Sequence, residues 1–446
     1  MKHPLGHRSG VKKGIINSGA FLFLLMLLSG FFACTESKES GAGKKELIRF
    51  VTWKPNQPEV WEEAIRRFHK KYPGLRVERE IGPHSSTEYH DLLTQKLKNR
   101  DTSVDVFFMD VIWPPEFAAA GWALPLDHYF SEEERKKFIE GPILANSYGG
   151  SIYGVPFWIS AGLLYYRKDL LDKYGLKPPG TWEEMVGQIK TILAAERKEK
   201  PNLKGYSAQF KQYEGLVCNM LEFIMGGGGT IMDPETGKPG IAGQEAFESL
   251  RFVRDEIVGG VAPKGILTYQ EPESLDLFIQ GGAVFHRNWP YAWEVSNNKE
   301  KSRIAGKVGI SVLPHFEGKK SYAALGGWQF GINRYSKKPD LAWKFIEFMT
   351  SPEIEKLLAG EAAQPPTRLS LYDDEEVLKK NPHFKDFKAV FLTAYPRPQS
   401  PFYPAISNIL QRYFSKALAI KDSNIKSLAK EAEAEILELS KKFGER

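Results

Sequence analysis

The stretch Val104-Asp105-Val106-Phe107-Phe108-Met109-Asp110 decides the fold class. Its apolar run is typical of a strand buried inside a sheet, and Asp110 ends it. Earlier apolar-polar runs predict strands at 47–53 and 75–81, and helices follow them at 58–71 and 88–99. Strands that alternate with helices predict a parallel sheet covered on both faces, and therefore an α/β fold.

Asp110 is the first candidate binding residue. In open α/β sheets, ligands bind outside the carboxyl ends of the strands, which is where Asp110 is expected. Its carboxylate has the capacity to accept two hydroxyl hydrogen bonds. A turn or cap aspartate is the alternative, and the residues by themselves leave both open. The segment 54–57 follows the first strand at the same edge.

A second stretch, Arg287-Asn288-Trp289-Pro290-Tyr291-Ala292-Trp293, holds three aromatic rings in five residues. It follows the apolar run Ala283–Phe285, which predicts a buried strand that ends at an aromatic cluster. Pro290 restricts the backbone on either side of it. Rings held at a strand end offer a stacking platform for a flat, partly apolar ligand such as a sugar ring. An aromatic cluster in the core beneath a loop is the alternative.

The chain length implies two domains, because 446 residues exceed the ~250–300 that one hydrophobic core accommodates. No long linker divides the chain, so several crossings between two lobes are expected, forming a hinge. Approximate bounds are 46–157 with 302–355 for the first lobe, and 158–301 with 356–446 for the second. The last segment, 403–442, is expected to be largely helical.

Residues 1–33 resemble an export signal. Arg8, Lys12 and Lys13 precede an apolar run from Phe21 that ends at Ala33 and is too short to span a bilayer comfortably. Cys34 follows at once and begins a polar, flexible tether over 34–45. This order resembles a bacterial lipoprotein signal, in which the cysteine is acylated. Phe31 and Phe32 depart from that motif, so plain secretion or an uncleaved anchor remain alternatives.

Charge and cysteine content exclude several classes of protein. The formal charge of +6 falls to about +2 without the leader, which carries Lys2, Arg8, Lys12 and Lys13 and no acid, so a nucleic-acid partner is not expected. Cys218 lies in an apolar run and is expected to be a buried, inert thiol. His84 and His90 are six residues apart without a third ligand, so we expect neither a metal nor another cofactor.

Five ordered segments of the chain together resemble one family of proteins. The chain is similar to the bacterial extracellular solute-binding proteins of sugar-transporting family 1, which are receptors of ABC importers, and within it to the trehalose/maltose-binding branch. The similarity implies a two-lobed, type II periplasmic-binding-protein-like fold, a sugar ligand, a permease partner and an exported monomer. It rests on Gly162-Leu163-Leu164-Tyr165-Tyr166-Arg167-Lys168-Asp169-Leu170-Leu171, Lys211-Gln212-Tyr213-Glu214-Gly215-Leu216-Val217-Cys218, the Arg287–Trp293 stretch, Leu325-Gly326-Gly327-Trp328 and Pro396-Arg397-Pro398.

The resemblance also implies a binding site between the lobes. Trp289, Tyr291 and Trp328 would stack on sugar rings. Asp110 would accept hydroxyl hydrogen bonds, and Arg397 would donate them. Gly327 matches a further position of the site, and Ser85, His90 and Trp158 are additional candidates for contact.

Three positions depart from the pattern of the branch. Ser160 and Gln57 stand where acidic residues are usual, and His90 stands where an arginine-like residue is usual. Replacing acids with neutral groups removes fixed acceptors, which suits an acidic or otherwise modified glucoside. Glucosylglycerol and glucosylglycerate therefore stay open beside trehalose and maltose.

Two other functions compete with capture of a sugar. A secreted glycosidase needs two carboxylates about 5–9.5 Å apart, and the sequence offers only Asp110 as a good candidate in the cleft. A lipid-anchored assembly module without a small ligand would show no change in melting temperature with any sugar. The resemblance favours a receptor that is not an enzyme.

Overall fold

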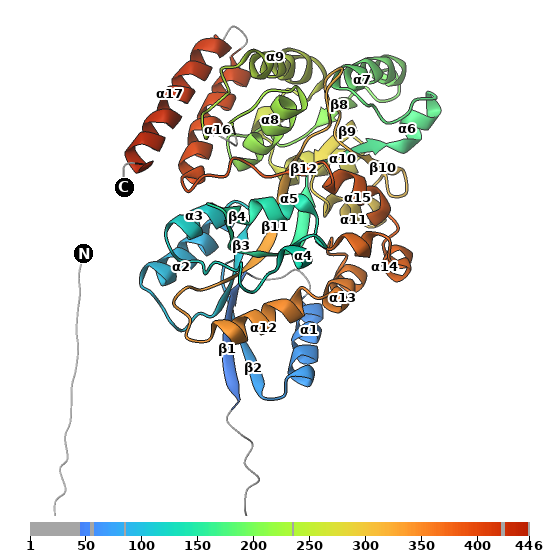
Figure 1. Ribbon diagram of the computed structural model, residues 1–446. Helices are drawn as coiled ribbons and strands as arrows, with labels where there is room; N and C mark the ends of the chain where they lie inside the picture. The colour runs from blue at the N-terminus through green and yellow to red at the C-terminus, as the bar shows by residue number, and fades with distance from the viewer. Residues whose placement is uncertain (1–44, 54–57, 84–85, 234–235, 421–423, 445–446) are drawn as a thin grey trace, which may run out of the picture. The chain divides into compact units, whose positions relative to one another are not determined.

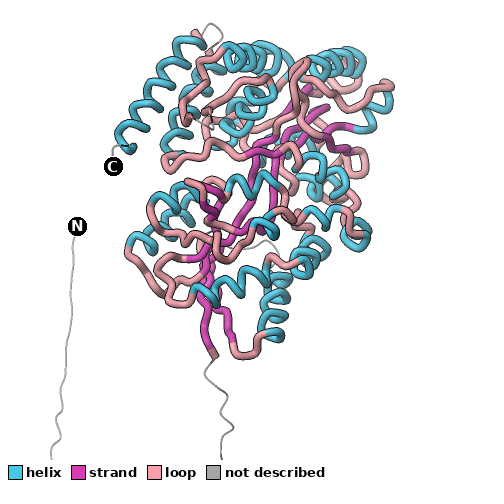
Figure 2. Tube along the Cα trace, viewed as in Figure 1, coloured by secondary structure: helices cyan, strands magenta, loops and turns pink. Residues whose placement is uncertain are grey.

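The computed structural model describes residues 45–53, 58–83, 86–233, 236–420 and 424–444. The expected leader and Cys34 lie outside the described residues, as do Gln57, His84 and Ser85. Two main sheets organise the described chain, and helices flank their strands (Figures 1 and 2). The α/β fold class is confirmed.

The first sheet contains the expected parallel strands. β1 (Glu46–Thr52) pairs in parallel with both β2 (Leu75–Ile81) and β3 (Val106–Asp110). β11 (Ala323–Ile332) joins antiparallel to β3 and to β6 (Val155–Ala161), and β12 (Ala394–Tyr395) pairs with the start of β11. The periodicity of 58–71 placed α1 (Pro58–Lys71) correctly, and Trp61, Ala64, Ile65 and Phe68 form its buried face.

The second sheet has the order β10-β7-β9-β8. Its strands are β7 (Leu163–Arg167), β8 (Lys204–Ser207), β9 (Ala283–Asn288) and β10 (Val308–Ser311). Every residue of β9 is buried, as the apolar run before the aromatic cluster predicted. β6 and β7 follow one another along the chain but do not pair, because β6 pairs with β11, whereas β7 pairs with β9 and β10.

Two strands pass from one hydrophobic core to the other. In β6, Val155 and Phe157 pack in the core of the first sheet, whereas Ile159 and Ala161 pack in the core of the second. β11 does the same, because Leu325 belongs to the second core and Phe330 to the first. The exact lobe bounds stay a prediction. β10 lies within 302–355, which was predicted to belong to the first lobe, yet it pairs in the second sheet. This pairing indicates that the second stretch of the first lobe begins after β10.

Helices and short strands complete the described chain. Thr181 accepts a hydrogen bond from the backbone N–H of Glu184 and thereby caps the N-terminus of the helix after it. No helix in the described ranges combines the length and apolar character needed to cross a bilayer. The remaining elements are α2 (Ser86–Lys98), α3 (Pro114–Ala119), α4 (Glu132–Arg135), α5 (Glu140–Ala145), β4 (Ser147–Tyr148), β5 (Ser151–Ile152), α6 (Lys168–Lys173), α7 (Trp182–Glu196), α8 (Glu214–Gly226), α9 (Gln244–Phe252), the π-helix η1 (Val253–Val261), η2 (Ile266–Thr268), α10 (Glu271–Ile279), α11 (Ala292–Asn297), α12 (Pro339–Met349), α13 (Pro352–Ala362), η3 (Leu369–Tyr372), α14 (Glu375–Lys380), α15 (Phe384–Phe391), α16 (Tyr403–Ala419) and α17 (Ile425–Gly444).

Candidate functional site

Two cavities share one wall, which β6 and the segment after β9 provide. The first, the aromatic chamber, has a volume of about 280 Å³ and is lined by Trp53, Trp61, Glu294, Gln364 and His383, among others. The second, the charged chamber, has a volume of about 610 Å³ and is lined by Asp110, Glu214, Glu271, Trp328 and Arg397, among others. The shared wall consists of Trp158, Ser160, Trp289 and Tyr291.

The polar centre of the charged chamber is an ion-pair network around Arg397. Its Nη1 donates to Glu214 Oε1 at 2.9 Å, and its Nη2 lies 3.6 Å from Asp110 Oδ1. Glu214 also accepts hydrogen bonds from the hydroxyls of Tyr403 and Ser407. Arg397 is 8% exposed, whereas the side chains of Asp110 and Glu214 are partly exposed to the chamber.

Asp110 can accept hydrogen bonds from a ligand, as its position at the end of a strand suggested. It is the last residue of β3, and its Oδ1 accepts from the backbone N–H of Ile112 at 3.3 Å. Burial raises the pKa of Asp110, while the guanidinium of Arg397 opposes that shift. A partly desolvated carboxylate at the edge of a cavity is a strong hydrogen-bond acceptor for a ligand hydroxyl.

A row of tryptophans crosses the sheet beside Asp110. Trp328 on β11 is the cross-strand neighbour of Trp158 on β6, and their ring centroids are 6.2 Å apart. Trp53, which directly follows β1, lies 5.6 Å from Trp328. Gly327 has a φ of 129°, and a Cβ there would overlap the carbonyl oxygen of Trp158. A glycine is needed at this position because the strands approach so closely.

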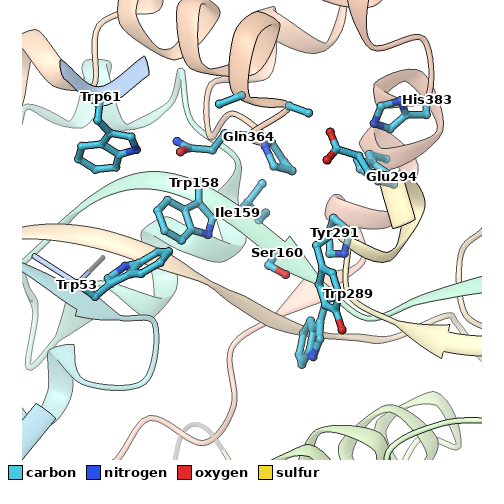
Figure 3. Close-up of a pocket in the computed structure, with 15 residues that line it drawn as sticks. Trp53, Trp61, Trp158, Ile159, Ser160, Trp289, Tyr291, Glu294, Gln364 and His383 are labelled. Atoms are coloured by element: carbon cyan, nitrogen blue, oxygen red, sulfur yellow. The ribbon is translucent and has the colours of Figure 1, made fainter. Parts of the chain in front are cut away.

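Figure 3 shows how the side chains meet in the aromatic chamber. Trp53 and Trp158 lie on one side, and Trp289 and Tyr291 lie on the other, with Ser160 between them. Tyr291 is 46% exposed, so its ring is available for stacking. Trp293, the third ring of the predicted platform, stacks on His383 instead and lines neither chamber.

The residues that line the two chambers carry more negative than positive charge. Burial lowers the pKa of His383 to about 4, so its ring is neutral at neutral pH. Burial also raises the pKa of Glu294, whose carboxylate points into the chamber (Figure 3). In the charged chamber, Asp110, Glu214 and Glu271 face Arg397 as the single positive group among the described lining residues. This balance argues against the acidic glucoside that Ser160 suggested.

Of the residues predicted for the site, the structure brings eight together. Asp110, Trp158, Ser160, Trp289, Tyr291, Gly327, Trp328 and Arg397 all line the charged chamber. His90 lines neither chamber, because its Nε2 lies 2.8 Å from Glu116 Oε2 and its ring packs against Trp113. Gln57 and Ser85 lie outside the described residues. The role of each predicted residue in binding stays a prediction.

Sequence reasoning missed several lining residues that the structure adds. Trp53 follows β1 at the same sheet edge as Asp110, so the rule that located Asp110 could also have found it. Glu214 lies in the segment 211–218, which is one of the five segments that carry the family resemblance. Nothing in the sequence around Glu271 or Glu294 indicates that they line a cavity. Cys218 is buried as predicted, and burial raises the pKa of its thiol to about 12. Within the described ranges, no group of His, Cys, Asp or Glu has the arrangement of a metal site.

Comparison with known proteins identifies related chains. Residues 54–356 match the family described as bacterial extracellular solute-binding protein. A probable ABC transporter-binding protein of Deinococcus radiodurans is 39% identical over 309 residues, which cover 69% of this chain and 72% of that protein. A maltotriose-binding protein of Pyrococcus abyssi is 25% identical over 90% of this chain and 84% of its own length.

Solved structures agree with these matches. Maltose-bound MalE3 of T. maritima superposes with a TM-score of 0.75 and 38% identity, covering 88% of this chain and 99% of that one. MalE of Xanthomonas citri superposes with a TM-score of 0.76 at 20% identity, covering 90% of this chain and all of the other, which supports the fold alone. These neighbours confirm the two-lobed binding-protein fold that the sequence predicted.

Proposed function

The chain belongs to the family of bacterial extracellular solute-binding proteins, and from this we propose that it captures a glucoside or disaccharide outside the cytoplasm and delivers it to an ABC permease. The family is exported, which places the mature protein in the periplasm or on the cell surface. Attachment through an acylated Cys34 and a monomeric state are parts of the proposal. The permease subunits would be its protein partner.

The observation that carries the proposal is the composition of the shared wall. Trp158, Trp289 and Tyr291 contribute aromatic rings to the lining of both chambers, and Ser160 adds a hydroxyl. A pyranose ring has apolar C–H faces and a polar rim, so it needs rings on its faces and fixed hydrogen-bonding groups at its edge. Asp110 and Arg397 supply such groups at the end of the wall.

Two of the related proteins support a glucoside as the ligand. One relative is named for maltotriose, and one solved neighbour at 38% identity holds maltose. A trehalose- or maltose-like glucoside is therefore the leading ligand. Glucosylglycerol and glucosylglycerate are the alternatives that the sequence left open.

Capture would make and break no covalent bond. The lobes would close on the sugar by motion at the strands that pass between the two cores, and the closed form would dock on the permease. Three rings that each cover on the order of 80–100 Å² of sugar give roughly 6–7.5 kcal/mol. Hydrogen bonds to Asp110 and Arg397 add about 1.5–3 kcal/mol each. Lobe closure and lost ligand freedom offset part of this sum, which leaves room for an affinity near 1 μM, or about −8 kcal/mol.

Tryptophan fluorescence tests the proposal directly, because Trp53, Trp158, Trp289 and Trp328 surround the chambers. The leaderless protein would be titrated with trehalose, maltose, sucrose, glucosylglycerol, glucosylglycerate and glucose. A saturable change with one of them is expected and would identify the class of ligand. Silence across the panel, with calorimetry also silent, would contradict capture of a common glucoside.

A further inference from the structure

Arg287 contacts Trp289 of the shared wall but does not itself line a chamber. The comparison with related proteins gives it no role. Its guanidinium carbon lies 4.2 Å from the centroid of the Trp289 ring, so the two planar groups are in stacking contact. Arg287 is fully buried and lines neither chamber. Trp289 lines both chambers. Trp289 is therefore a direct link between Arg287 and a ligand in either chamber.

Arg287 is held by a buried carboxylate. Its Nε donates to Glu222 Oε2 at 2.8 Å, and its Nη2 forms an ion pair with Glu222 Oε1. Its Nη1 donates to Gln209 Oε1 at 3.2 Å. The side chains of Arg287 and Glu222 are 0% and 2% exposed. Contacts on three nitrogens of a planar fork fix the orientation of the guanidinium as well as its position.

Trp289 is also held at the edge of its ring and along its backbone. Its Nε1 donates to Glu271 Oε1 at 3.3 Å, and Glu271 Oε2 in turn accepts from the hydroxyl of Tyr213 at 2.7 Å. The hydroxyl of Tyr165 donates to the carbonyl oxygen of Trp289 at 2.8 Å. The edge and the backbone of this residue are thereby located. Arg287 supplies the contact on the ring face.

Glu222 also joins this arrangement to a strand that passes between the cores. Its Oε1 accepts from the backbone N–H of Ala324 at 3.1 Å, and Ala324 lies on β11 four residues before Trp328. One carboxylate therefore contacts both the partner of Trp289 and the strand that carries Trp328. Gly162 leaves the space for it, because a Cβ there would overlap both Glu222 Oε1 and Arg287 Nη2.

We propose that the Arg287–Glu222 pair is a positioning element for ligand binding, which holds the Trp289 indole in its binding orientation and ties it to β11. A buried ion pair is weak evidence for stability, because apolar replacements of similar volume often preserve folding. Here the pair would also affect binding, since it fixes the position of the Trp289 ring in the shared wall. This inference rests on the proposed function, because it needs a ligand that stacks on Trp289.

The test is a double-mutant cycle against Trp289. Arg287→Met combined with Glu222→Gln removes both charges, keeps similar volumes and leaves an acceptor for Ala324. In the leaderless protein, this pair of changes should weaken the binding of the sugar identified by fluorescence by about tenfold. In a Trp289→Ala background the same pair should change the dissociation constant by less than about twofold, because the ring through which it acts is gone.

A matched control lies where β7 meets α6. Arg167 and Asp169 form a two-bond ion pair on β7 and α6, and neither residue lines a chamber. Arg167→Met with Asp169→Asn should lower the melting temperature without weakening binding. Arg287→Lys offers a second, milder variant that keeps the charge and loses the planar stack, and it should also weaken binding.

Each outcome decides between alternatives. Equal weakening in the wild-type and Trp289→Ala backgrounds would overturn positioning through the indole, and unchanged binding in both would overturn any role in binding. In either case the capture of a sugar would stand. If the wild-type protein binds no glycoside of the panel, the proposed function fails and this inference fails with it.

Discussion

Asp110 and Trp328 are direct cross-strand neighbours, although more than 200 residues separate them in the chain. Asp110 ends β3, and Trp328 stands opposite it on the antiparallel strand β11. On its other side, Trp328 is paired in register with Trp158 of β6. β11 thereby places a carboxylate and two indoles in one row at the edge of the charged chamber.

Removing Trp328 should weaken binding at least tenfold. Trp328→Ala deletes a stacking surface from the charged chamber, and tenfold corresponds to about 1.4 kcal/mol. Calorimetry with the sugar identified by fluorescence measures the change. Trp343→Ala is the control, since Trp343 stacks on Tyr129 and lines neither chamber. An unchanged affinity in Trp328→Ala would remove this residue from the site.

Adding one methyl group at Gly162 should disrupt the Arg287–Glu222 pair. The new Cβ in Gly162→Ala would overlap both partners, so we expect a loss of a few kcal/mol in the free energy of unfolding, together with weaker sugar binding. Thermal and urea unfolding measure the first effect.

The control for this change is Gly187→Ala. Gly187 lies in the interior of α7, and no atom lies within 4 Å of the position that a Cβ would take there, so alanine should stabilise the protein by up to about 1 kcal/mol. If both variants were equally stable, the crowding around Gly162 would be relieved by a shift of the neighbouring side chains.

Glu355 should make stability depend on pH near neutrality. It is 1% exposed, accepts from the backbone N–H and hydroxyl of Thr367 at 2.8 Å each, and accepts from the backbone N–H of Arg368 at 3.1 Å. Burial raises its pKa from 4.5 to about 7. A folded-state pKa above the unfolded value means that this carboxyl group stabilises the fold below about pH 4.5 and that this contribution is lost as the pH rises through about 7.

The effect of Glu355 is measurable as the slope of the free energy of unfolding against pH. Integrated over that window, the contribution of Glu355 is on the order of 3 kcal/mol. Urea unfolding of the wild-type protein and of Glu355→Gln between pH 4.5 and 8 isolates this group, since the other titrating groups are common to both. The wild-type protein should gain more stability on acidification than the variant. Parallel curves would show that Glu355 has an ordinary pKa.

Anionic glycosides should bind less tightly than neutral ones. A ligand carboxylate would meet Asp110 and Glu271 in the charged chamber or Glu294 in the aromatic chamber, and such like-charge repulsion costs several kcal/mol. Glucosylglycerate should therefore bind at least about tenfold more weakly than glucosylglycerol. Competition against the identified sugar measures both affinities. Glu294→Gln should narrow the gap, whereas Glu438→Gln on α17 should not. Tighter binding of glucosylglycerate would restore the acidic-ligand hypothesis that Ser160 and Gln57 suggested.

Cys34→Ser should release the exported protein from membranes. The substitution removes the thiol that the lipoprotein hypothesis requires for acylation, and the polar tether that follows contains no apolar run that could anchor the chain in its place. Fractionation of cells that express the full chain measures the distribution. Continued attachment would mean that the leader remains as an anchor, and release of the unaltered protein would indicate plain secretion.

The sequence by itself determined the elements and much of the site. The periodicity of 58–71 gave α1 its bounds and buried face, and the apolar run before Asp110 placed that carboxylate at a strand end. Ordered motifs then identified the family and eight of the residues around the charged chamber. These features are local because they depend on spacing, strand ends and residue type, all of which can be read along the chain.

Only the tertiary structure decided how distant segments meet. β6 pairs with β11, more than 150 residues later in the chain, and not with its sequence neighbour β7, because the choice of strand partner depends on which cores the strands enter. His90 does not line a chamber, because its side chain contacts Glu116, which lies 26 residues away in the sequence. The support of Trp289 by Arg287 and Glu222 is likewise a relationship between β9 and α8. Burial, ion pairing and ring stacking across such separations arise from packing, so no spacing along the sequence encodes them.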